Sequence, residues 1–334
     1  MPPSIESLEL PPFRPRFPWW GADLQTVAVL WNARPTGLEP HTSERVCFPM
    51  NDGSGDTLLG MLDTPVAPIE GRPLAVLIHG LTGSESSFYM LNNAGHLLDL
   101  GFHVLRLNLR GAGPSRAFCR EQYFIGRTAD FRRVLQLLPS KLTGDGVAAV
   151  GFSLGGAMLL KFLGEDGVFS PLCAAATVCA PLDLMRTCRH MMKNRNALYH
   201  RYLLSHLKTE ATGEGAALTD EERANIRNAR TLWDYDAGFI APRHGFASAE
   251  EYYEICSPLN YLAEIRVPTL ALAAKDDPWV PAEFYGDFDW TTNAALVPLL
   301  AEGGGHIGFH GEGKQPWSDL AVGRFLEMAC CQSQ

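Results

Sequence analysis

The sequence has little positive charge: its 334 residues contain 28 Lys and Arg against 37 Asp and Glu, which gives a net charge of −9 at pH 7. A protein that binds nucleic acid usually gathers Lys and Arg on one surface to meet the phosphates. The one locally basic stretch, from Arg186 to Arg195, is better explained as a solvated helix face. We therefore expect no nucleic-acid partner, and the acidic balance also argues against an anionic polymer as substrate.

Long apolar runs are missing as well. The longest candidate, residues 147–160, is shorter than the roughly 18 residues that a membrane helix needs, and it is interrupted by Ser153 and by glycines. The first residues lack a charged stretch followed by an apolar one, so we expect no secretory signal. The eight cysteines include no Cys-x-x-Cys pair. We therefore expect reduced thiols, no transmembrane segment and a cytoplasmic protein.

Short aliphatic runs alternate with helical patterns from about residue 43 onward, which indicates an α/β fold with a mostly parallel sheet covered by helices. The first two runs flank the glycine-rich turn 51–55 and should form an antiparallel hairpin at the edge of the sheet. The expected strands lie at 46–49, 58–63, 74–79, 103–108, 147–152, 174–179, 268–274 and 295–300, and the expected helices at 87–100, 128–138, 154–163 and 316–328.

The alternation stops after Pro181 and resumes only at Pro268. A gap of roughly 85 residues is far longer than a normal loop, and apolar and aromatic residues recur in it at helical spacing. Something folded must fill it. We therefore expect an N-terminal extended arm at 1–42, an α/β core made of 43–181 and 267–334, and a helical cap inserted at 182–266.

The strongest local signal is the segment Gly151-Phe152-Ser153-Leu154-Gly155-Gly156, which lies between an apolar run and a helical pattern. A nucleophile elbow needs this context, because the chain turns sharply from strand to helix and side chains beside the serine would collide with backbone. Ser153 would then stand at a helix N-terminus, where backbone N–H groups stabilise an anion. We predict that Ser153 is a nucleophile.

A serine nucleophile needs a histidine base and a carboxylate that orients it, and in folds with this elbow the acid and then the histidine follow the serine. His306 lies in a glycine-rich loop after the last expected strand and is the best base by position. The acid should follow the strand 268–274, where Asp276 and Asp277 compete. We favour Asp277, because the acid is usually the first residue of an Asp-Pro-x-Val-Pro segment.

Acyl transfer also needs donors for the oxyanion of the tetrahedral intermediate, usually two backbone N–H groups. Those of Leu81, in the loop after the strand 74–79, and of Leu154 are our candidates. His79 is better explained as a residue that shapes this loop than as a catalyst. His306 and His310 stand in a glycine-rich segment that lacks the Glu of a zinc motif, so we expect no metal site.

These candidates belong to motifs that are spread over almost the whole chain: WWGADLQTV at 19–27, HGLTGSES at 79–86, NLRGAGPS at 108–115, GFSLGG at 151–156, DYD at 234–236, APRHGF at 241–246, EYY at 251–253, DDP at 276–278 and GGHIGF at 304–309. In combination the motifs resemble the YheT-like branch of the α/β-hydrolase superfamily, which includes bacterial esterases and eukaryotic lipid-acting members. The resemblance implies the α/β-hydrolase fold and a hydrolase of carboxylic esters that needs no cofactor. It carries the roles of the triad onto Ser153, Asp277 and His306.

We therefore expect a small-molecule ester substrate with an apolar acyl chain of short to medium length. Acyl transfer to an alcohol, or thioester cleavage, through the same acyl-enzyme stays open. A non-catalytic binding module of this fold is less favoured, because all three residues are present. The family has a Tyr-His-x-Gly-x-Thr-x-Asp segment where this chain has Phe124 in place of the histidine, which leaves an accessory role of that histidine in doubt.

Overall fold

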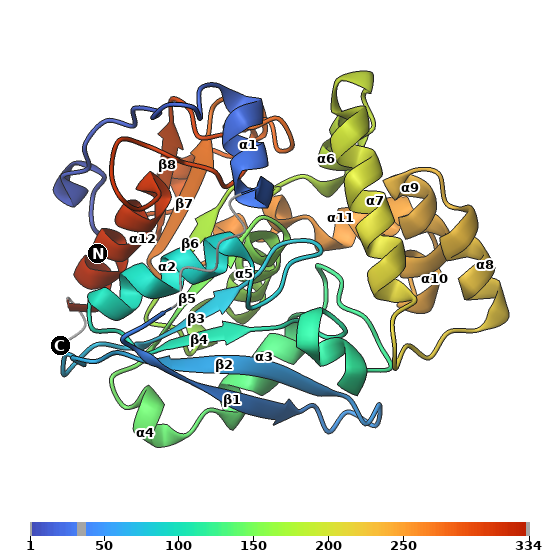
Figure 1. The fold of residues 1–334 in the computed structure, drawn as a ribbon, viewed down its shortest axis with the longest axis horizontal. Coiled ribbons are helices and arrows are strands. Elements are labelled where there is room, and N and C mark those ends of the chain that lie inside the picture. The colour runs from blue at the N-terminus through green and yellow to red at the C-terminus, as the bar shows by residue number, and fades with distance from the viewer. Residues whose placement is uncertain (1, 32–37, 332–334) are drawn as a thin grey trace.

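The computed structural model describes residues 2–31 and 38–331, and a single eight-stranded sheet runs through it (Figure 1). The strand order is β1-β2-β4-β3-β5-β6-β7-β8; β1 and β2 form an antiparallel hairpin, β2 is antiparallel to β4, and all other neighbours are parallel. The expected mostly parallel sheet is confirmed. Its strands are β1 (Thr42–Pro49), β2 (Thr57–Thr64), β3 (Leu74–Ile78), β4 (Val104–Leu107), β5 (Val147–Phe152), β6 (Ala174–Val178), β7 (Thr269–Ala274) and β8 (Leu296–Ala301).

Helices cover both faces of this sheet. Four of them were expected: α2 (Phe88–Asp99), α3 (Thr128–Leu137), α5 (Leu154–Asp166) and α12 (Trp317–Cys331). Successive residues of a strand point to opposite faces, so β3 contributes to two apolar clusters. Val76 and Ile78 pack with residues of α3 and α5, whereas Ala75 and Leu77 pack with residues of α2 and α12. Figure 1 shows α2 and α12 together at one face and α3 at the other.

The segment between β6 and β7 is helical, as its periodicity predicts. It contains α6 (Leu184–Met191), α7 (Ala197–Ala211), α8 (Asp220–Asn228), α9 (Leu232–Tyr235), α10 (Ala241–Arg243) and α11 (Ala249–Cys256), and a π-helical turn over Asp236–Ile240 joins α9 to α10. Most of these helices gather at one side of the molecule (Figure 1). We propose that residues 182–266 act as a cap on the core formed by 43–181 and 267–334.

The N-terminal arm departs from the expectation of an extended segment. Residues Ala22–Trp31 form the helix α1, and Glu6–Leu8 form a short 3-10 turn. The expectation came from the many prolines before residue 19, and it missed that none lies within α1. A second short helix, α4 (Ser140–Thr143), was also not expected.

A buried arginine ties the β1–β2 turn to the rest of the core. The Arg110 guanidinium donates to Asp52, Asp56 and Asp130 at 2.7 to 2.9 Å. Arg110 is only 1% exposed, so its charge depends on these carboxylates for compensation. The glycine-rich turn 51–55 is therefore fixed by an ion-pair network.

Within the described part of the chain, the structure has no helix with the length and apolar character that a membrane span requires. No disulfide joins the cysteines whose side chains it describes.

Candidate active site

Ser153 stands at the sharp turn between β5 and α5. Its backbone has φ 49° and ψ −117°, a conformation that non-glycine residues rarely adopt and that functional sites often contain. Its N–H donates to the carbonyl of Val178 at 2.9 Å, and its own carbonyl accepts the N–H of Ala157 at 2.9 Å. The strand on one side and the helix on the other thus hold the strained residue in place.

The glycines around Ser153 are needed for close backbone approach. A Cβ atom on Gly151 would lie 2.6 Å from the carbonyl oxygen of Gly155, and one on Gly155 would lie 2.4 Å from the carbonyl oxygen of Ile78. Both distances are far below van der Waals contact. The structure therefore explains in backbone terms why the motif has glycine at these positions.

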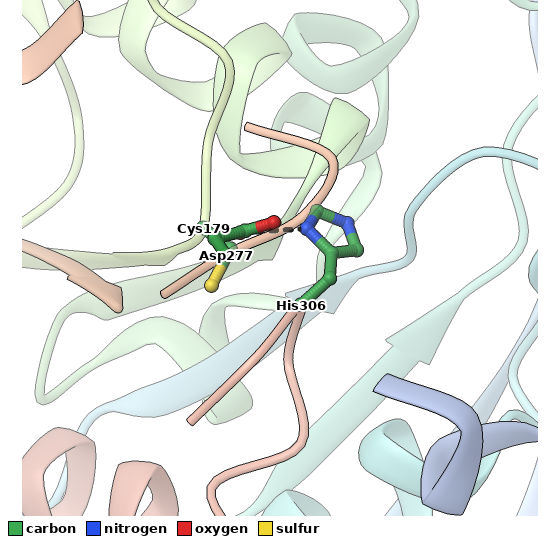
Figure 2. Close-up of side chains that lie close together, drawn as sticks. All are labelled: Cys179, Asp277 and His306. Atoms are coloured by element: carbon green, nitrogen blue, oxygen red, sulfur yellow. Dashed lines mark hydrogen bonds and ion pairs between the residues drawn. The ribbon is translucent and has the colours of Figure 1, made fainter. Parts of the chain in front are cut away.

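Ser153, His306 and Asp277 form one chain of hydrogen bonds. His306 Nε2 lies 2.9 Å from Ser153 Oγ, and His306 Nδ1 lies 2.8 Å from Asp277 Oδ2. The serine follows β5, the aspartate follows β7 and the histidine follows β8, so all three stand beyond the carboxyl ends of parallel strands, where such ends share one edge of the sheet. Figure 2 shows the Asp277 carboxylate directed at the imidazole ring.

The two candidate aspartates have different partners. Asp277 Oδ1 accepts the backbone N–H groups of Trp279 and Val280 at 2.8 and 3.0 Å, which leaves Oδ2 directed at His306. Asp276 Oδ1 accepts the N–H of Gly305 at 2.9 Å. Asp276 therefore shapes the histidine loop, and Asp277 contacts the histidine ring itself.

Two further residues position His306, and neither was expected from the sequence. Thr26 Oγ1, in α1, accepts the backbone N–H of His306 at 2.8 Å. The indole of Trp279 stacks on the imidazole with ring centroids 4.5 Å apart. Both residues lie inside or next to segments already noted in the sequence, but their contacts with the histidine depend on the folded arm and loop.

The two predicted oxyanion donors come from different elements. Leu81 follows β3, Leu154 begins α5, and both line the same cavity as Ser153. The elbow turn itself positions Leu154. Leu81 lies in a loop that contacts with other residues must hold in place.

Two tyrosines hold that loop. The Tyr89 hydroxyl accepts the N–H of Gly80 at 2.9 Å, and the Tyr123 hydroxyl accepts the N–H of Thr82 at 2.8 Å. Thr82 has φ 57°, which a β-branched residue rarely adopts. The Tyr123 hydroxyl in turn donates to Glu210 Oε2 of α7 at 3.0 Å. The loop beside Leu81 is thereby connected to a helix of the proposed cap.

His79 has the loop-shaping contacts that the sequence predicts. Its Nδ1 lies 2.7 Å from the carbonyl oxygen of Gly80, and its Nε2 lies 3.0 Å from the backbone N of Leu109, which donates to it. Nδ1 must then carry the proton and donate to the carbonyl. Burial lowers the pKa of His79 to about 4. The ring is therefore neutral at pH 7 and both its nitrogens are occupied.

A thiol lies close to the acid and the histidine. One ligand atom each from Cys179, Asp277 and His306 lies within 4.8 Å of the others, but Figure 2 shows the Cys179 thiol turned away from the ring. Burial and the nearby Asp277 raise the pKa of this thiol well above its ordinary value. Metal ligation needs a thiolate, so the donor set suits a hydrogen-bonded acid and histidine better than a metal ion.

The serine opens onto a cavity of about 350 Å³. Much of its lining is apolar and comes from the segment 182–266 as well as from the core, and among the described residues no Lys or Arg lines it. Its apolar lining residues include Leu184, Met191, Leu203, Leu207, Leu232, Ile240 and Val280. Phe124, which stands where the family has a histidine, also lines the cavity. Its ring stacks on that of His244, with the ring centroids 4.2 Å apart.

Two carboxyl groups of the segment 182–266 have a raised pKa. Burial raises the pKa of Asp236 to about 7, although its Oδ2 accepts the Tyr253 hydroxyl at 2.5 Å. Burial likewise raises the pKa of Glu210 to about 7, while Tyr123 and Arg116 oppose the shift. In the sequence, Asp236 stands out only as part of the DYD motif at 234–236, and Glu210 only as one acidic position among others.

Comparison with known proteins places this geometry in a family. Residues 73–312 match the model of the alpha/beta hydrolase fold family. The YheT protein of Escherichia coli (strain K12) is 33% identical over 248 residues, which cover 73% of each chain. A Saccharomyces cerevisiae protein named medium-chain fatty acid ethyl ester synthase/esterase 2 is 29% identical over 280 residues, which cover 76% of this chain and 62% of the yeast protein.

A solved structure shows the same fold. An esterase of Pyrococcus furiosus, Pf2001, superimposes with a TM-score of 0.59 at 17% identity, over 88% of this chain and 95% of that one. The family match spans the elbow, both aspartates and His306, and the eight-stranded sheet has the layout that the resemblance implied. The chain therefore belongs to the α/β-hydrolase family, in its YheT-like branch.

Proposed function

We propose that the protein is a serine hydrolase that cleaves carboxylic esters through an acyl-enzyme. The observation that carries the proposal is the pair of hydrogen bonds that joins Asp277 to His306 and His306 to Ser153 at the wall of a cavity. His306 Nε2 takes the proton from Ser153 Oγ as the oxygen attacks the ester carbonyl. Asp277 keeps the other proton on Nδ1 and stabilises the imidazolium that forms.

The backbone N–H groups of Leu81 and Leu154 are the proposed donors to the oxyanion of the tetrahedral intermediate. His306 then returns its proton to the departing alcohol, which leaves the acyl group on Ser153. Water attacks this ester by the same route, with His306 again as base, and the released acid restores the free serine. The cycle needs no group beyond the protein and water.

The cavity supports an apolar acyl chain of short to medium length. Its volume of about 350 Å³ is at the lower end of ordinary ligand cavities, and its lining is largely apolar with no Lys or Arg among the described residues. A small-molecule ester with an uncharged acyl chain fits these surroundings. Residues 182–266 supply much of the wall, so the proposed cap would set acyl preference.

Acyl transfer to an alcohol is the second candidate. It is favoured by the yeast relative, whose name assigns it both ester synthesis and ester hydrolysis. The chemistry differs only in whether water or an alcohol attacks the acyl-enzyme, and thioester cleavage would use the same residues. A binding module without activity is less favoured, because nucleophile, base and acid are all present within hydrogen-bonding distance.

A panel of p-nitrophenyl esters from acetyl to dodecanoyl, with matched thioesters, tests the proposal. We expect ester turnover with the highest kcat/KM between butanoyl and decanoyl and at least a thousandfold loss in Ser153→Ala. A repeat with added ethanol measures how much ethyl ester forms in place of free acid. Turnover that is undiminished in Ser153→Ala, or absent for every ester in folded protein, would overturn the proposal.

A further inference from the structure

The N-terminal arm packs its backbone directly against the loop that carries His306. A Cβ atom on Gly305 would lie 2.5 Å from the carbonyl oxygen of Ala22, and one on Gly308 would lie 2.3 Å from that of Gln25. Any larger residue would collide with α1 at either position, so only glycine permits this approach. The glycines on either side of His306 therefore serve the contact between the loop and the arm.

The histidine loop has a strained backbone and needs support from outside. Ile307 has φ 65° and Phe309 has φ 46°, in the left-handed region that non-glycine residues rarely adopt, least of all a β-branched one. Such a backbone costs free energy and persists only where its surroundings hold it. Contacts from other segments must therefore fix the position of His306, which directly precedes Ile307.

Thr26 holds the backbone of His306 itself. Its side chain is buried, and its hydroxyl donates to the carbonyl of Ala22 at 2.8 Å. A hydroxyl has one proton and two lone pairs. Because the proton is used in this way, the oxygen presents a lone pair to the N–H of His306, from which it accepts at 2.8 Å. The direction of both hydrogen bonds is thereby determined.

Gln25 holds the loop four residues further along. Its Oε1 accepts the N–H of His310 at 2.7 Å, and its Nε2 donates to the carbonyl of His310 at 3.1 Å and to that of Trp19 at 2.5 Å. The buried amide thus pairs with both backbone groups of His310, much as a neighbouring strand would. These backbone partners also settle which amide atom is the oxygen.

Proton transfer depends on where the loop places the imidazole. His306 Nε2 lies 2.9 Å from Ser153 Oγ and Nδ1 lies 2.8 Å from Asp277 Oδ2. A displacement of about 1 Å from such a geometry can cost about 100-fold in rate. The hydrogen bonds of Gln25 and Thr26 go to the backbone of the loop, so both residues act on the ring through the loop.

We propose that Gln25 and Thr26 form a clamp of positioning residues, which holds His306 in the geometry of proton exchange with Ser153. The inference rests on the proposed function, because the clamp affects catalysis only if His306 is the base. The motif at 19–27 lies outside the residues 73–312 that match the family model. The clamp thus adds a segment of the arm to the active site of the α/β core.

Thr26→Val removes the hydroxyl and keeps the shape of the side chain, which also lines the cavity. We expect kcat to fall about 10- to 100-fold with KM within about threefold of wild type, because the ester still binds while the base is misplaced. The rate of labelling by a fluorophosphonate probe should fall by a similar factor, since the probe reacts with the activated serine. Thr26→Ser restores the hydroxyl and should recover kcat to within about threefold.

Thr269→Val is the matched control. Thr269 is also a buried threonine, and its hydroxyl donates to the carbonyl of Val267 at 2.8 Å, at the amino end of β7, away from the site. This variant should lower the melting temperature without lowering kcat. Gln25→Met removes the other half of the clamp and should lower kcat as Thr26→Val does. Circular dichroism at the assay temperature shows which variants are folded.

Three outcomes in folded protein would overturn the clamp. They are a kcat of both Thr26→Val and Gln25→Met within about threefold of wild type, a Thr26→Ser variant as slow as Thr26→Val, and an equal loss of kcat in Thr269→Val. In each of these cases wild type still cleaves esters, so the proposed function stands. A wild type that cleaves no ester would reject the proposed function and the clamp together.

Discussion

At the scale of single residues, the neighbours Asp276 and Asp277 allow a direct test of which carboxylate orients His306. Asp277 contacts the His306 ring, whereas Asp276 contacts only a backbone N–H of the histidine loop. Asp277→Asn should lower kcat about 10³- to 10⁴-fold, because the amide cannot hold the proton on Nδ1 and stabilise the imidazolium. Asp276→Asn keeps an oxygen that can accept from Gly305 and should cost less than about tenfold. Steady-state kinetics on one ester measures both.

Circular dichroism of both aspartate variants serves as the control, because each change alters a half-buried or buried carboxyl. A greater loss in folded Asp276→Asn than in folded Asp277→Asn would show that the acid has been assigned to the wrong residue.

Tyr123 provides a second prediction at this scale. Its hydroxyl accepts the N–H of Thr82 next to the proposed donor Leu81, and Tyr123→Phe leaves that N–H without its acceptor. We expect kcat to fall about 10- to 100-fold with KM little changed, because the loop that carries the proposed oxyanion donor is loosened. Tyr261→Phe removes a hydroxyl that donates to the Ile255 carbonyl, and this control should behave as wild type. An unchanged kcat in Tyr123→Phe would refute this role of the hydroxyl.

At the scale of elements, the Arg110 network binds the β1–β2 turn to α3. Replacing Arg110 by Met would leave the buried Asp56 carboxylate without a cation and would leave Asp130 only its pair with Arg127 at 3.3 Å. We expect the free energy of unfolding to fall by about 3–5 kcal/mol in urea titrations. The matched control is Arg195→Ala, whose pair with Asp23 is about half exposed and should contribute less than about 1 kcal/mol. Equal losses in the two variants would contradict the importance of the network.

The elements themselves differed in how well the sequence predicted them. Strands such as β5 and β7 are buried along their whole length, and their continuous apolar runs predicted them almost to the residue. The order of the strands in the sheet could not be predicted, because it depends on which neighbours pair after the helices have crossed over. The helix α1 was missed since the prolines before it dominated the interpretation of the arm.

The stability of the whole molecule depends on pH through groups whose pKa is shifted by burial. Asp319, at the start of α12, is 2% exposed, and burial raises its pKa to about 7 against the opposing hydrogen bond from Asn93. The folded state therefore keeps a proton that the unfolded chain releases above pH 4. This group stabilises the fold fully at low pH, and its contribution is lost as the pH rises to about 7.

Asp319→Asn isolates this contribution, because the amide has no proton to release. We expect the free energy of unfolding of the variant, relative to wild type, to increase by up to about 4 kcal/mol between pH 4 and pH 7 and to level off above. Urea titrations of both proteins across this range measure the difference. A difference that is independent of pH, or that favours wild type as the pH rises, would contradict a raised pKa at Asp319.

Sequence alone predicted Ser153, Asp277 and His306 as one set, because each lies at the end of a recognisable strand and the order along the chain is constrained. The residues that hold these three in place could not be predicted from the sequence. Thr26 reaches the histidine loop from a segment 280 residues away, and Tyr123 and Glu210 meet only when the segment 182–266 packs on the core.

The proposed function depends on Ser153 as the nucleophile, activated by His306. Treatment of the folded protein with a fluorophosphonate probe, followed by mass spectrometry of its peptides, tests this claim most directly, because the probe phosphonylates an activated serine and the modified peptide identifies it. We expect one probe per chain on Ser153, and no labelling of folded Ser153→Ala. Labelling of another serine, equal labelling of Ser153→Ala, or no labelling of folded wild type would contradict it.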